Sequence, residues 1–312
     1  MDRLRVGVVG VGYLGRFHAL IYSRLPGVEL VGVADTRAEV AQQVAAEAGC
    51  AAYADGRDLL GKVDAVSVVV PTTAHLAIAR PFLEHGTHVL LEKPIATTAE
   101  EGRAIVQLAR RSGAVLQIGH LERYNGGVMA LAARISQPRF IEAHRMSGFV
   151  ARATDVDVIS DLMIHDIDII LALVGSDIVS IAAVGTPVLT DHIDIANARL
   201  EFANGAVANV IASRVSRDKS RRIRVFQERC YLSLDFIEQH LDVVYPREQP
   251  GEEWPEIVTE RVAIEPVKPL DAEIADFVAC IRERREPFVS GEVGVEALEV
   301  ALAVKERILS GR

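Results

Sequence analysis

The stretch that decides the fold is LRVGVVGVGYLG, residues 4–15. It begins as an apolar run and then places Gly10, Gly12 and Gly15 in a GxGxxG pattern, directly before a helical stretch. Such glycines permit a tight turn and let a pyrophosphate approach the backbone at the N-terminus of the helix. Residues 4–15 therefore predict the strand, the phosphate-binding turn and the helix of a dinucleotide-binding domain.

Asp35 supports this interpretation, because it stands 20 residues beyond Gly15 at the end of the next predicted strand. A carboxylate there accepts hydrogen bonds from the ribose hydroxyls of a dinucleotide. It would repel the 2′-phosphate of NADP, so the sequence favours NAD, although Arg37 nearby leaves NADP open. A glycine-rich turn in a fold that binds no nucleotide is the alternative.

The first 120 residues alternate apolar strand patterns with helical ones. Continuously apolar strands are typical of a parallel sheet buried on both faces, and the strand–helix repeat requires right-handed crossovers. Residues 1–120 therefore predict an α/β domain with a doubly wound parallel sheet, in which Thr98 caps the last helix. We expect strands at 4–9, 29–34, 64–70, 87–91 and 114–119, and helices at 14–23, 37–48, 74–85 and 99–112.

The pattern changes after Gly119, where predicted strands follow one another without helices between them. Consecutive strands favour an antiparallel sheet, and Asn204–Gly205 is a strong hairpin signal. Residues 121–312 therefore predict a second, α+β domain with a mostly antiparallel sheet. We expect strands at 139–147, 178–186, 193–202, 206–213, 222–226 and 230–234, a loop at 246–255, and helices at 161–174, 271–284 and 292–309.

Composition and charge restrict the class of protein. The 312 residues are 50% hydrophobic and 25% charged, which is typical of a globular protein of two domains. The net charge of −9 disfavours nucleic acid and anionic membranes as partners. The apolar runs are too short to span a bilayer, the N-terminus lacks a signal-peptide pattern, and three scattered cysteines favour neither disulfides nor zinc. We therefore expect a cytoplasmic protein.

Two further patterns could carry chemistry. EKP at 92–94 follows a strand at the carboxyl edge of the parallel sheet, where its lysine could polarise a substrate oxygen or relay a proton. Asp161 and His165 are spaced i and i+4, which suits a general base oriented by a carboxylate. The alternatives are a surface turn for EKP, and a surface pair or a metal site with Asp168 for the helix. Because the two patterns lie in different domains, we expect the site between domains.

Six segments in order resemble the Gfo/Idh/MocA oxidoreductase family over essentially the whole chain. They are GVVGVGYLGRFH at 7–18, VVVPTTAH at 68–75, EKP at 92–94, GHLERYN at 119–125, DLMIHDIDIIL at 161–171 and GVEALEVALAVKERILSGR at 294–312. The resemblance implies a Rossmann domain followed by a domain with a large open sheet that mediates homodimers or homotetramers. It implies an NAD-dependent dehydrogenase acting on CH–OH groups.

The same resemblance assigns residues to roles. It implies that Lys93 is the catalytic lysine, that Asp161 and His165 form the family's Asp-x-x-x-His pair, and that Lys93–Pro94 is a cis peptide. The residues that it implies for cofactor binding are Gly10, Gly12, Tyr13, Leu14, Gly15, Asp35, Thr36, Arg37, Pro71, Thr72, His75, Glu92 and Lys93.

GHLERYN at 119–125 is similar to the GHxERFN pattern of the family's sugar-nucleotide 3-dehydrogenases, in particular those acting on UDP-N-acetylglucosamine. Tyr124 replaces Phe, and Gly126 stands where Pro is common. The resemblance implies oxidation of the sugar at C3, feeding a PLP-dependent aminotransferase in the synthesis of lipid A or another surface sugar. The expected substrate contacts are His120, Arg123, Tyr124, Asn125, Arg145, Arg152 and His165. For the segment 119–125 the alternative is a helix start that its Arg and Asn merely cap and solvate.

A nucleotide sugar also needs positive charge for its diphosphate. Six basic residues crowd into 214–224, namely Arg214, Arg217, Lys219, Arg221, Arg222 and Arg224. A solvated strand face or a subunit contact is the alternative for this segment. A free polyol or monosaccharide (inositol-type) dehydrogenase would need no such patch. A non-catalytic NAD-binding regulator would need neither the lysine of EKP nor the Asp–His pair.

Overall fold

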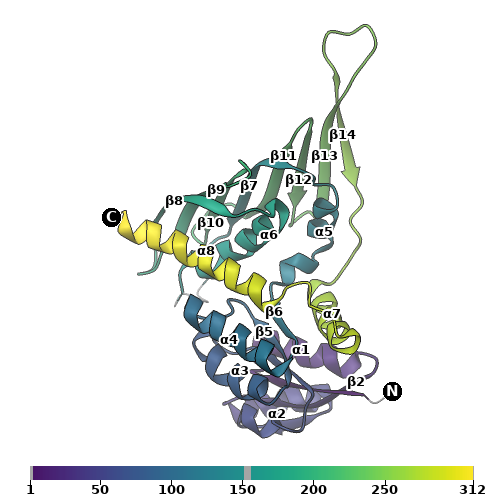
Figure 1. Ribbon diagram of the computed structural model, residues 1–312, viewed down its shortest axis with the longest axis vertical. Helices are drawn as coiled ribbons and strands as arrows, with labels where there is room; N and C mark the ends of the chain where they lie inside the picture. Colours follow the sequence, from purple (N-terminus) through teal and green to yellow (C-terminus); the bar gives the residue numbers. More distant parts are fainter. Residues whose placement is uncertain (1–2, 151–155, 312) are drawn as a thin grey trace. The chain divides into compact units, whose positions relative to one another are not determined.

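The computed structural model describes residues 3–150 and 156–311. Contacts divide the chain into two compact units, coloured by sequence in Figure 1. The first comprises the chain through Leu121 together with Lys268–Leu298, and the second comprises Glu122–Val267 and the residues from Glu299 onward. Segment 268–298, which we expected in the second domain, therefore groups with the first. In the described part of the chain, no helix is both long and apolar enough to cross a membrane.

The first unit is built on a six-stranded sheet whose neighbouring strands are all parallel. In spatial order its strands are β3 (Ala51–Tyr53), β2 (Val28–Ala34), β1 (Leu4–Val9), β4 (Ala65–Val68), β5 (His88–Glu92) and β6 (Leu116–Gly119). Every residue of β4 and β6 is buried, as in a sheet covered on both faces. The predicted doubly wound α/β fold is confirmed, and the short β3 is a strand that the sequence pattern missed.

Helices connect the parallel strands in the way that crossovers require. They are α1 (Tyr13–Arg24), α2 (Ala38–Ala48), α3 (His75–Glu84) and α4 (Ala99–Ser112). Thr98 caps α4 as predicted, because its side chain accepts the Glu101 N–H at 3.2 Å. A helix from far along the chain, α7 (Pro269–Glu283), joins the same core, where its Phe277 clusters with Val6 and Tyr22. The strand order reverses between β1 and β4, which is where open α/β sheets bind ligands.

The second unit contains an eight-stranded sheet that is antiparallel except for the β7–β10 pair. In spatial order its strands are β14 (Glu256–Val262), β13 (His240–Arg247), β12 (Cys230–Asp235), β11 (Ser220–Gln227), β7 (Pro138–Met146), β10 (Val207–Ser213), β9 (Ile195–Phe202) and β8 (Ile178–Thr186). The mostly antiparallel sheet is as predicted, and Asn204–Gly205 joins β9 to β10. The predicted loop at 246–255 is shorter than expected, because Pro246 lies in β13 and pairs with Ile257.

Helices pack on this second sheet. The short α5 (Gly126–Ala132), which was not predicted, contacts β12 and β13, while α6 (Ile164–Val174) contacts β7 and β10. A π-helical turn, Ile159–Met163, leads directly into α6. The closing helix α8 (Gly291–Ser310) begins in the first unit and ends in the second.

Candidate active site

A cavity of about 600 Å³ lies at the carboxyl ends of β1, β2 and β4 in the first unit. Of the residues predicted to bind the cofactor, its lining includes Gly10, Gly12, Asp35, Thr36, Arg37 and Pro71. It does not include Tyr13, Leu14, Gly15, Thr72, His75, Glu92 or Lys93. Residues 54–57, after β3, also line it. Sequence reasoning missed them because a three-residue strand leaves too short an apolar pattern to detect.

The three glycines of the turn differ in what surrounds them. A Cβ on Gly10 would lie 2.3 Å from the Val69 carbonyl oxygen, and a Cβ on Gly15 would lie 1.9 Å from the Gly10 carbonyl oxygen. Packing therefore demands glycine at both positions. At Gly12 such a Cβ would meet only an Arg37 nitrogen, at 3.8 Å, so the backbone is open there. Open backbone before the α1 N-terminus is the cradle that a pyrophosphate needs, and these residues fit NAD.

Asp35 is held in place at the end of β2. Its Oδ2 accepts the Val11 N–H at 3.0 Å, and its Oδ1 accepts the Arg37 backbone N–H at 3.0 Å and the Arg37 Nε–H at 3.3 Å. Burial raises the pKa of this carboxyl, but the hydrogen bonds and the Arg37 charge outweigh burial and lower the pKa below its ordinary value. Asp35 is therefore an anion at neutral pH in the cavity lining, as acceptance of ribose hydroxyls requires.

The loop after β4 leads into α3 and is held by the buried side chain of His75. Pro71 lines the cavity, and Thr72 begins a short 3₁₀ turn, Thr72–Ala74. His75 is fully buried, with its ring nitrogens 3.0 Å from the Val70 carbonyl oxygen and 3.3 Å from the Ile95 carbonyl oxygen. Burial lowers the pKa of this imidazole. The His75 ring thus lies between two backbone carbonyls of the neighbouring loops, outside the cavity lining, and its contact with the cofactor stays a prediction.

Lys93 follows β5 at the carboxyl edge of the sheet, as the sequence predicts, and the Lys93–Pro94 peptide is cis. The neighbouring Glu92 side chain is buried. Its Oε1 lies 3.2 Å from His18 Nε2, and its Oε2 accepts the Lys93 backbone N–H at 3.4 Å. The Glu92 side chain therefore contacts His18 and the Lys93 backbone and does not line the cavity.

In the second unit, Asp161 lies in the π-helical turn and His165 at the start of α6. Both residues are half-buried, and π turns are frequent at functional sites. Asp168, farther along α6, is buried, and its Oδ1 lies 3.3 Å from Arg123 Nη1. Burial raises the pKa of Asp168 to about 7, against the opposing effect of Arg123. Asp168 therefore has an ion-pair partner of its own.

Residues 120–125 occupy different environments. His120 is fully buried at the end of the first unit, and Tyr124 is buried in the second. The Asn125 side chain accepts the Gly127 N–H at 2.9 Å and thereby caps α5. Asn125 thus does what the capping alternative predicts.

Arg145, which we expected to contact substrate, is 3% exposed. Its Nε and Nη2 each donate to the Asp166 carboxylate at 2.9 Å, and its Nη1 donates to Glu122 Oε1 at 2.9 Å. Burial lowers the pKa of the guanidinium, but the two carboxylates outweigh burial and raise it. Arg145 is therefore part of an ion-pair network with Asp166 and Glu122, and its contact with substrate stays a prediction. Arg152, also predicted to bind substrate, lies outside the described residues.

The basic segment 214–224 is partly neutralised within the second unit. Arg222 Nη2 lies 2.8 Å from Asp235 Oδ2, and Arg224 Nη2 lies 2.5 Å from Glu142 Oε2. These pairs run between neighbouring strands, as expected for a charged strand face. They favour the alternative interpretation of this segment over a dedicated diphosphate site.

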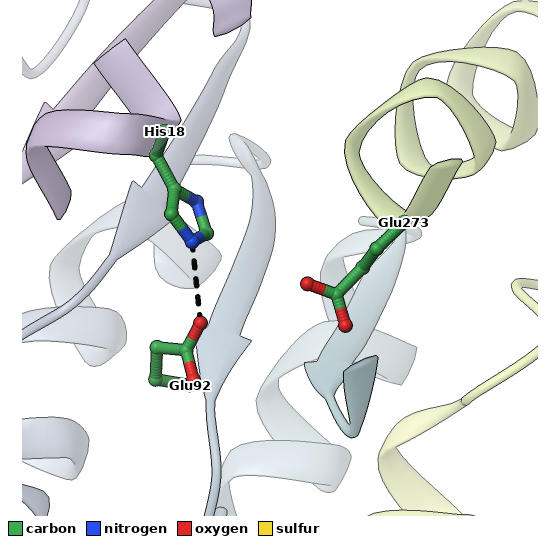
Figure 2. Close-up of side chains that lie close together, drawn as sticks. All are labelled: His18, Glu92 and Glu273. Atoms are coloured by element: carbon green, nitrogen blue, oxygen red, sulfur yellow. Dashed lines mark ion pairs between the residues drawn. The ribbon is translucent and has the colours of Figure 1, made fainter. Parts of the chain in front are cut away.

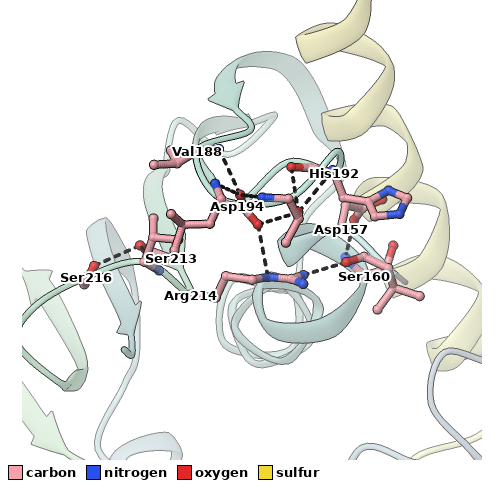
Figure 3. A network of polar contacts seen from close by, with 12 residues as sticks. Asp157, Ser160, Val188, His192, Asp194, Ser213, Arg214 and Ser216 are labelled. Carbon is pink, nitrogen blue, oxygen red and sulfur yellow. Dashed lines mark hydrogen bonds and ion pairs between the residues drawn. The ribbon is translucent and has the colours of Figure 1, made fainter. Parts of the chain in front are cut away.

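Arg214 belongs to a network of polar contacts that holds the residues directly before the π-helical turn (Figure 3). Asp194 Oδ2 accepts three successive backbone N–H groups of loop 188–190, and its Oδ1 lies 3.8 Å from Arg214 Nε. Burial raises the pKa of Asp194, but these N–H groups outweigh burial and lower it. Arg214 Nη2 donates to the Val156 carbonyl oxygen at 2.7 Å. Asp157 Oδ1 accepts the Ser160 N–H at 2.8 Å, directly before Asp161. The network thus fixes the segment that carries the predicted acid–histidine pair.

Comparisons with known families agree with this architecture. Residues 4–120 match the family described as an oxidoreductase family with an NAD-binding Rossmann fold, and residues 122–233 match the GFO/IDH/MocA C-terminal domain. The chain belongs to the Gfo/Idh/MocA oxidoreductase family. This Gfo/Idh/MocA chain is therefore an NAD-dependent oxidoreductase, as the sequence resemblance implied.

Individual relatives cover nearly the whole chain. A UDP-N-acetylglucosamine 3-dehydrogenase of Acidithiobacillus ferrooxidans is 41% identical over 98% of this chain and 97% of its own length. Its solved structure has a TM-score of 0.93 at 40% identity, covering 99% of this chain and 98% of that one. The scyllo-inositol 2-dehydrogenase (NAD(+)) of Bacillus subtilis is 26% identical over 99% of this chain and 95% of its own length.

Proposed function

We propose that the protein oxidises the C3 hydroxyl of UDP-N-acetylglucosamine to the 3-keto sugar nucleotide. The observation that carries this proposal is the 41% identity, over 98% of the chain, to a UDP-N-acetylglucosamine 3-dehydrogenase, against 26% to an inositol dehydrogenase. The GHLERYN segment at 119–125, which is similar to the pattern of such dehydrogenases, agrees with it. NAD, when bound, supplies the hydride acceptor, which leaves binding of the sugar and movement of its hydroxyl proton to the protein.

The catalytic residues in this proposal are Lys93, Asp161 and His165. His165, oriented by Asp161, takes the hydroxyl proton, while Lys93 stabilises the oxyanion that forms. The roles of lysine and histidine could also be exchanged, with Lys93 carrying the proton and His165 positioning the sugar. Support comes from the position of Lys93 at the ligand-binding edge of the sheet, and from the anchored, π-helical approach to His165.

A second candidate is a dehydrogenase of a free polyol or monosaccharide, such as an inositol. The specific observation in its favour is the pairing of Arg222 with Asp235 and of Arg224 with Glu142. These contacts consume positive charge that a UDP diphosphate would require. The two candidates share fold, cofactor and catalytic residues, so they differ only in what binds beyond the oxidised ring.

The wider assignment follows from the same proposal. Residues 1–120 would bind NAD, and residues 121–312 would bind the substrate and form a homodimer or homotetramer in the cytoplasm. A 3-keto sugar is a suitable substrate for a PLP-dependent aminotransferase, which would place the reaction in the synthesis of lipid A or another surface sugar.

The substrate is tested by NADH formation. Purified protein with NAD is given UDP-N-acetylglucosamine, N-acetylglucosamine or myo-inositol, with a PLP-dependent aminotransferase and its amino donor added in parallel to drain the ketone. We expect turnover of the UDP-sugar alone. Turnover of only the free sugar or polyol would discard the nucleotide-sugar substrate and favour the second candidate.

The catalytic lysine is tested by Lys93→Met. Loss of a general acid or of an oxyanion stabiliser typically lowers kcat by about 10²–10⁴-fold. We expect such a loss with NAD affinity unchanged, because Lys93 is not in the cavity lining. Lys62→Met, at an exposed position of the same unit, is the matched control. Full activity of Lys93→Met would remove this residue from the mechanism.

A further inference from the structure

A buried cluster outside the cavity lining joins three elements of the first unit (Figure 2). His18 projects from α1, Glu92 from the end of β5 and Glu273 from α7, and one side-chain atom of each lies within 4.8 Å of the others. His18 and Glu273 are fully buried, and Glu92 is 7% exposed. Solvent therefore cannot compensate the charge of this cluster, which has to be balanced from within.

One side of the cluster leads to the proposed catalytic lysine. His18 Nδ1 lies 3.2 Å from Ser67 Oγ, which also contacts the Tyr22 hydroxyl at 2.8 Å. His18 Nε2 lies 3.2 Å from Glu92 Oε1, and Glu92 Oε2 accepts the Lys93 N–H at 3.4 Å. A continuous chain of contacts thus runs from α1 to the Lys93 backbone.

The other side of the cluster is the carboxylate of Glu273 on α7. Neither carboxylate oxygen of Glu273 has a hydrogen-bond partner among the described residues. Gln117 Nε2 donates to the Glu273 backbone carbonyl at 2.9 Å, but within the same described part of the chain Gln117 Oε1 also has no partner. The titratable groups that face Glu273 are Glu92 on β5, His18 and Tyr22 on α1, and Asp276 on α7 itself. Burial and the charges of Glu92 and Asp276 raise the pKa of Glu273 well above its ordinary value.

We propose that Glu92 and Glu273 share one proton at neutral pH, and that Glu273 is a positioning residue that holds Lys93 through Glu92. The proton turns one surplus acceptor into a donor, so the two carboxyl groups attract instead of repelling each other. Glu92, held between His18 and Glu273, then fixes the Lys93 N–H at the end of β5. The positioning role rests on the proposed function of Lys93, whereas the shared proton does not.

A divalent cation is the rival way to neutralise two buried carboxylates beside a histidine. A cation needs an entry path and further ligands, whereas a proton needs neither. The surroundings of Glu92 are also closely packed, because a Cβ on Gly119 would lie only 2.8 Å from Glu92 Oε2. Burial and packing therefore favour the proton.

Infrared spectroscopy of the whole protein tests the proton directly. In wild type at neutral pH we expect a protonated-carboxyl band that shifts on ¹³C labelling of glutamate. The band should vanish in Glu273→Gln and persist in Glu283→Gln, which changes an exposed glutamate of the same helix. Absence of the band in wild type would overturn the proposal. So would one equivalent of Zn²⁺ or Mn²⁺, found by elemental analysis or titration, that Glu273→Gln abolishes.

Steady-state kinetics tests the positioning role. Glutamine keeps a neutral donor, so Glu273→Gln should retain kcat close to wild type. Glu273→Ala should lower kcat about tenfold, with KM for NAD unchanged, because a small displacement of Lys93 costs rate more than binding. Equal losses in both variants, or none in Glu273→Ala, would overturn the positioning role. If wild type fails to oxidise UDP-N-acetylglucosamine, the proposed substrate fails, while the infrared result still decides the shared proton.

Discussion

The two units treat buried charge differently. In the second unit Arg145 is shared by two carboxylates, Asp166 and Glu122, so each buried charge has a partner of opposite sign. In the first unit the buried carboxylates of Glu92 and Glu273 lie together beside His18, and among the described residues no Lys or Arg forms an ion pair with either of them. In a paired network of this kind, removing one partner leaves a buried charge uncompensated and is strongly destabilising. The uncompensated carboxylates of Glu92 and Glu273 instead favour binding of a proton, and Glu92 directly precedes the proposed catalytic residue Lys93.

The largest expected effect on stability comes from removing Arg145 from the ion-pair network of the second unit. Arg145→Met would remove the guanidinium that pairs with Asp166 and Glu122 in the described part of the chain, and we expect a loss of about 3–5 kcal/mol in the free energy of unfolding. Arg222→Met, which removes a half-exposed ion pair, should cost only about 0–1 kcal/mol. Urea denaturation of both variants measures the difference. Equal losses would mean that burial of the Arg145 network adds nothing to its contribution.

A second pair of variants separates glycines that serve packing from those that serve the ligand. Gly15→Ala pushes a methyl group into the Gly10 carbonyl oxygen and should cost about 1–3 kcal/mol of stability. Gly12→Ala meets open space, so its stability should stay within about 0.5 kcal/mol of wild type. The added methyl would occupy the approach of the pyrophosphate, and NAD affinity should fall at least about tenfold. Thermal unfolding measures the effect on stability, and NAD titration measures the effect on binding. Unchanged NAD affinity in Gly12→Ala would mean that the pyrophosphate does not bind at Gly12.

Sequence reasoning succeeded where the signal is local. Apolar runs predicted most strands, and Asn204–Gly205 predicted a hairpin. Each of these signals depends on a few adjacent residues. The glycine turn and Asp35, read at their fixed spacing, predicted a cofactor site whose residues in part line the cavity. The strand β3 is too short to give a pattern, and Pro246 disguised β13, because proline is tolerated only at special places in a sheet.

What could not be predicted depends on contacts between distant segments. Nothing in the sequence near Glu92 indicates that a helix far along the chain will place Glu273 beside it. The motif at 68–75 predicted a loop that in part lines the cavity. It gave no sign that the His75 imidazole would lie buried against two backbone carbonyls. Likewise Arg145 was predicted as a substrate contact because its charge is visible in the sequence, whereas its two buried acidic partners are not.

The buried carboxyl pair of Glu92 and Glu273 in the first unit predicts a pH dependence of stability. The folded state raises the Glu273 pKa, so it keeps a proton that the unfolded chain releases. Stabilisation is complete below the ordinary glutamate pKa and is lost as pH rises towards the raised value, at up to about 1.4 kcal/mol per pH unit. Asp168, with a pKa raised to about 7, adds a slope of the same sign in every variant that retains it.

Chemical denaturation across this pH range isolates the contribution of Glu273. Glu273→Gln should flatten the fall in stability between the ordinary glutamate pKa and neutral pH, while Glu283→Gln should follow wild type. Parallel curves for wild type and Glu273→Gln would show that the folded state does not hold this proton.

The smallest effect concerns Asn125, where a substrate contact and a helix cap make different predictions. Its side chain already accepts the Gly127 N–H, so Asn125→Ala should cost about 1 kcal/mol of stability, as loss of an N-cap does. Asn125→Asp keeps an acceptor for the same N–H and should restore stability. If the side chain only caps α5, KM for the sugar nucleotide should stay unchanged in both variants. A raised KM in Asn125→Ala at unchanged stability would instead return Asn125 to the substrate site, and would show that this polar residue of the second unit serves binding rather than the fold.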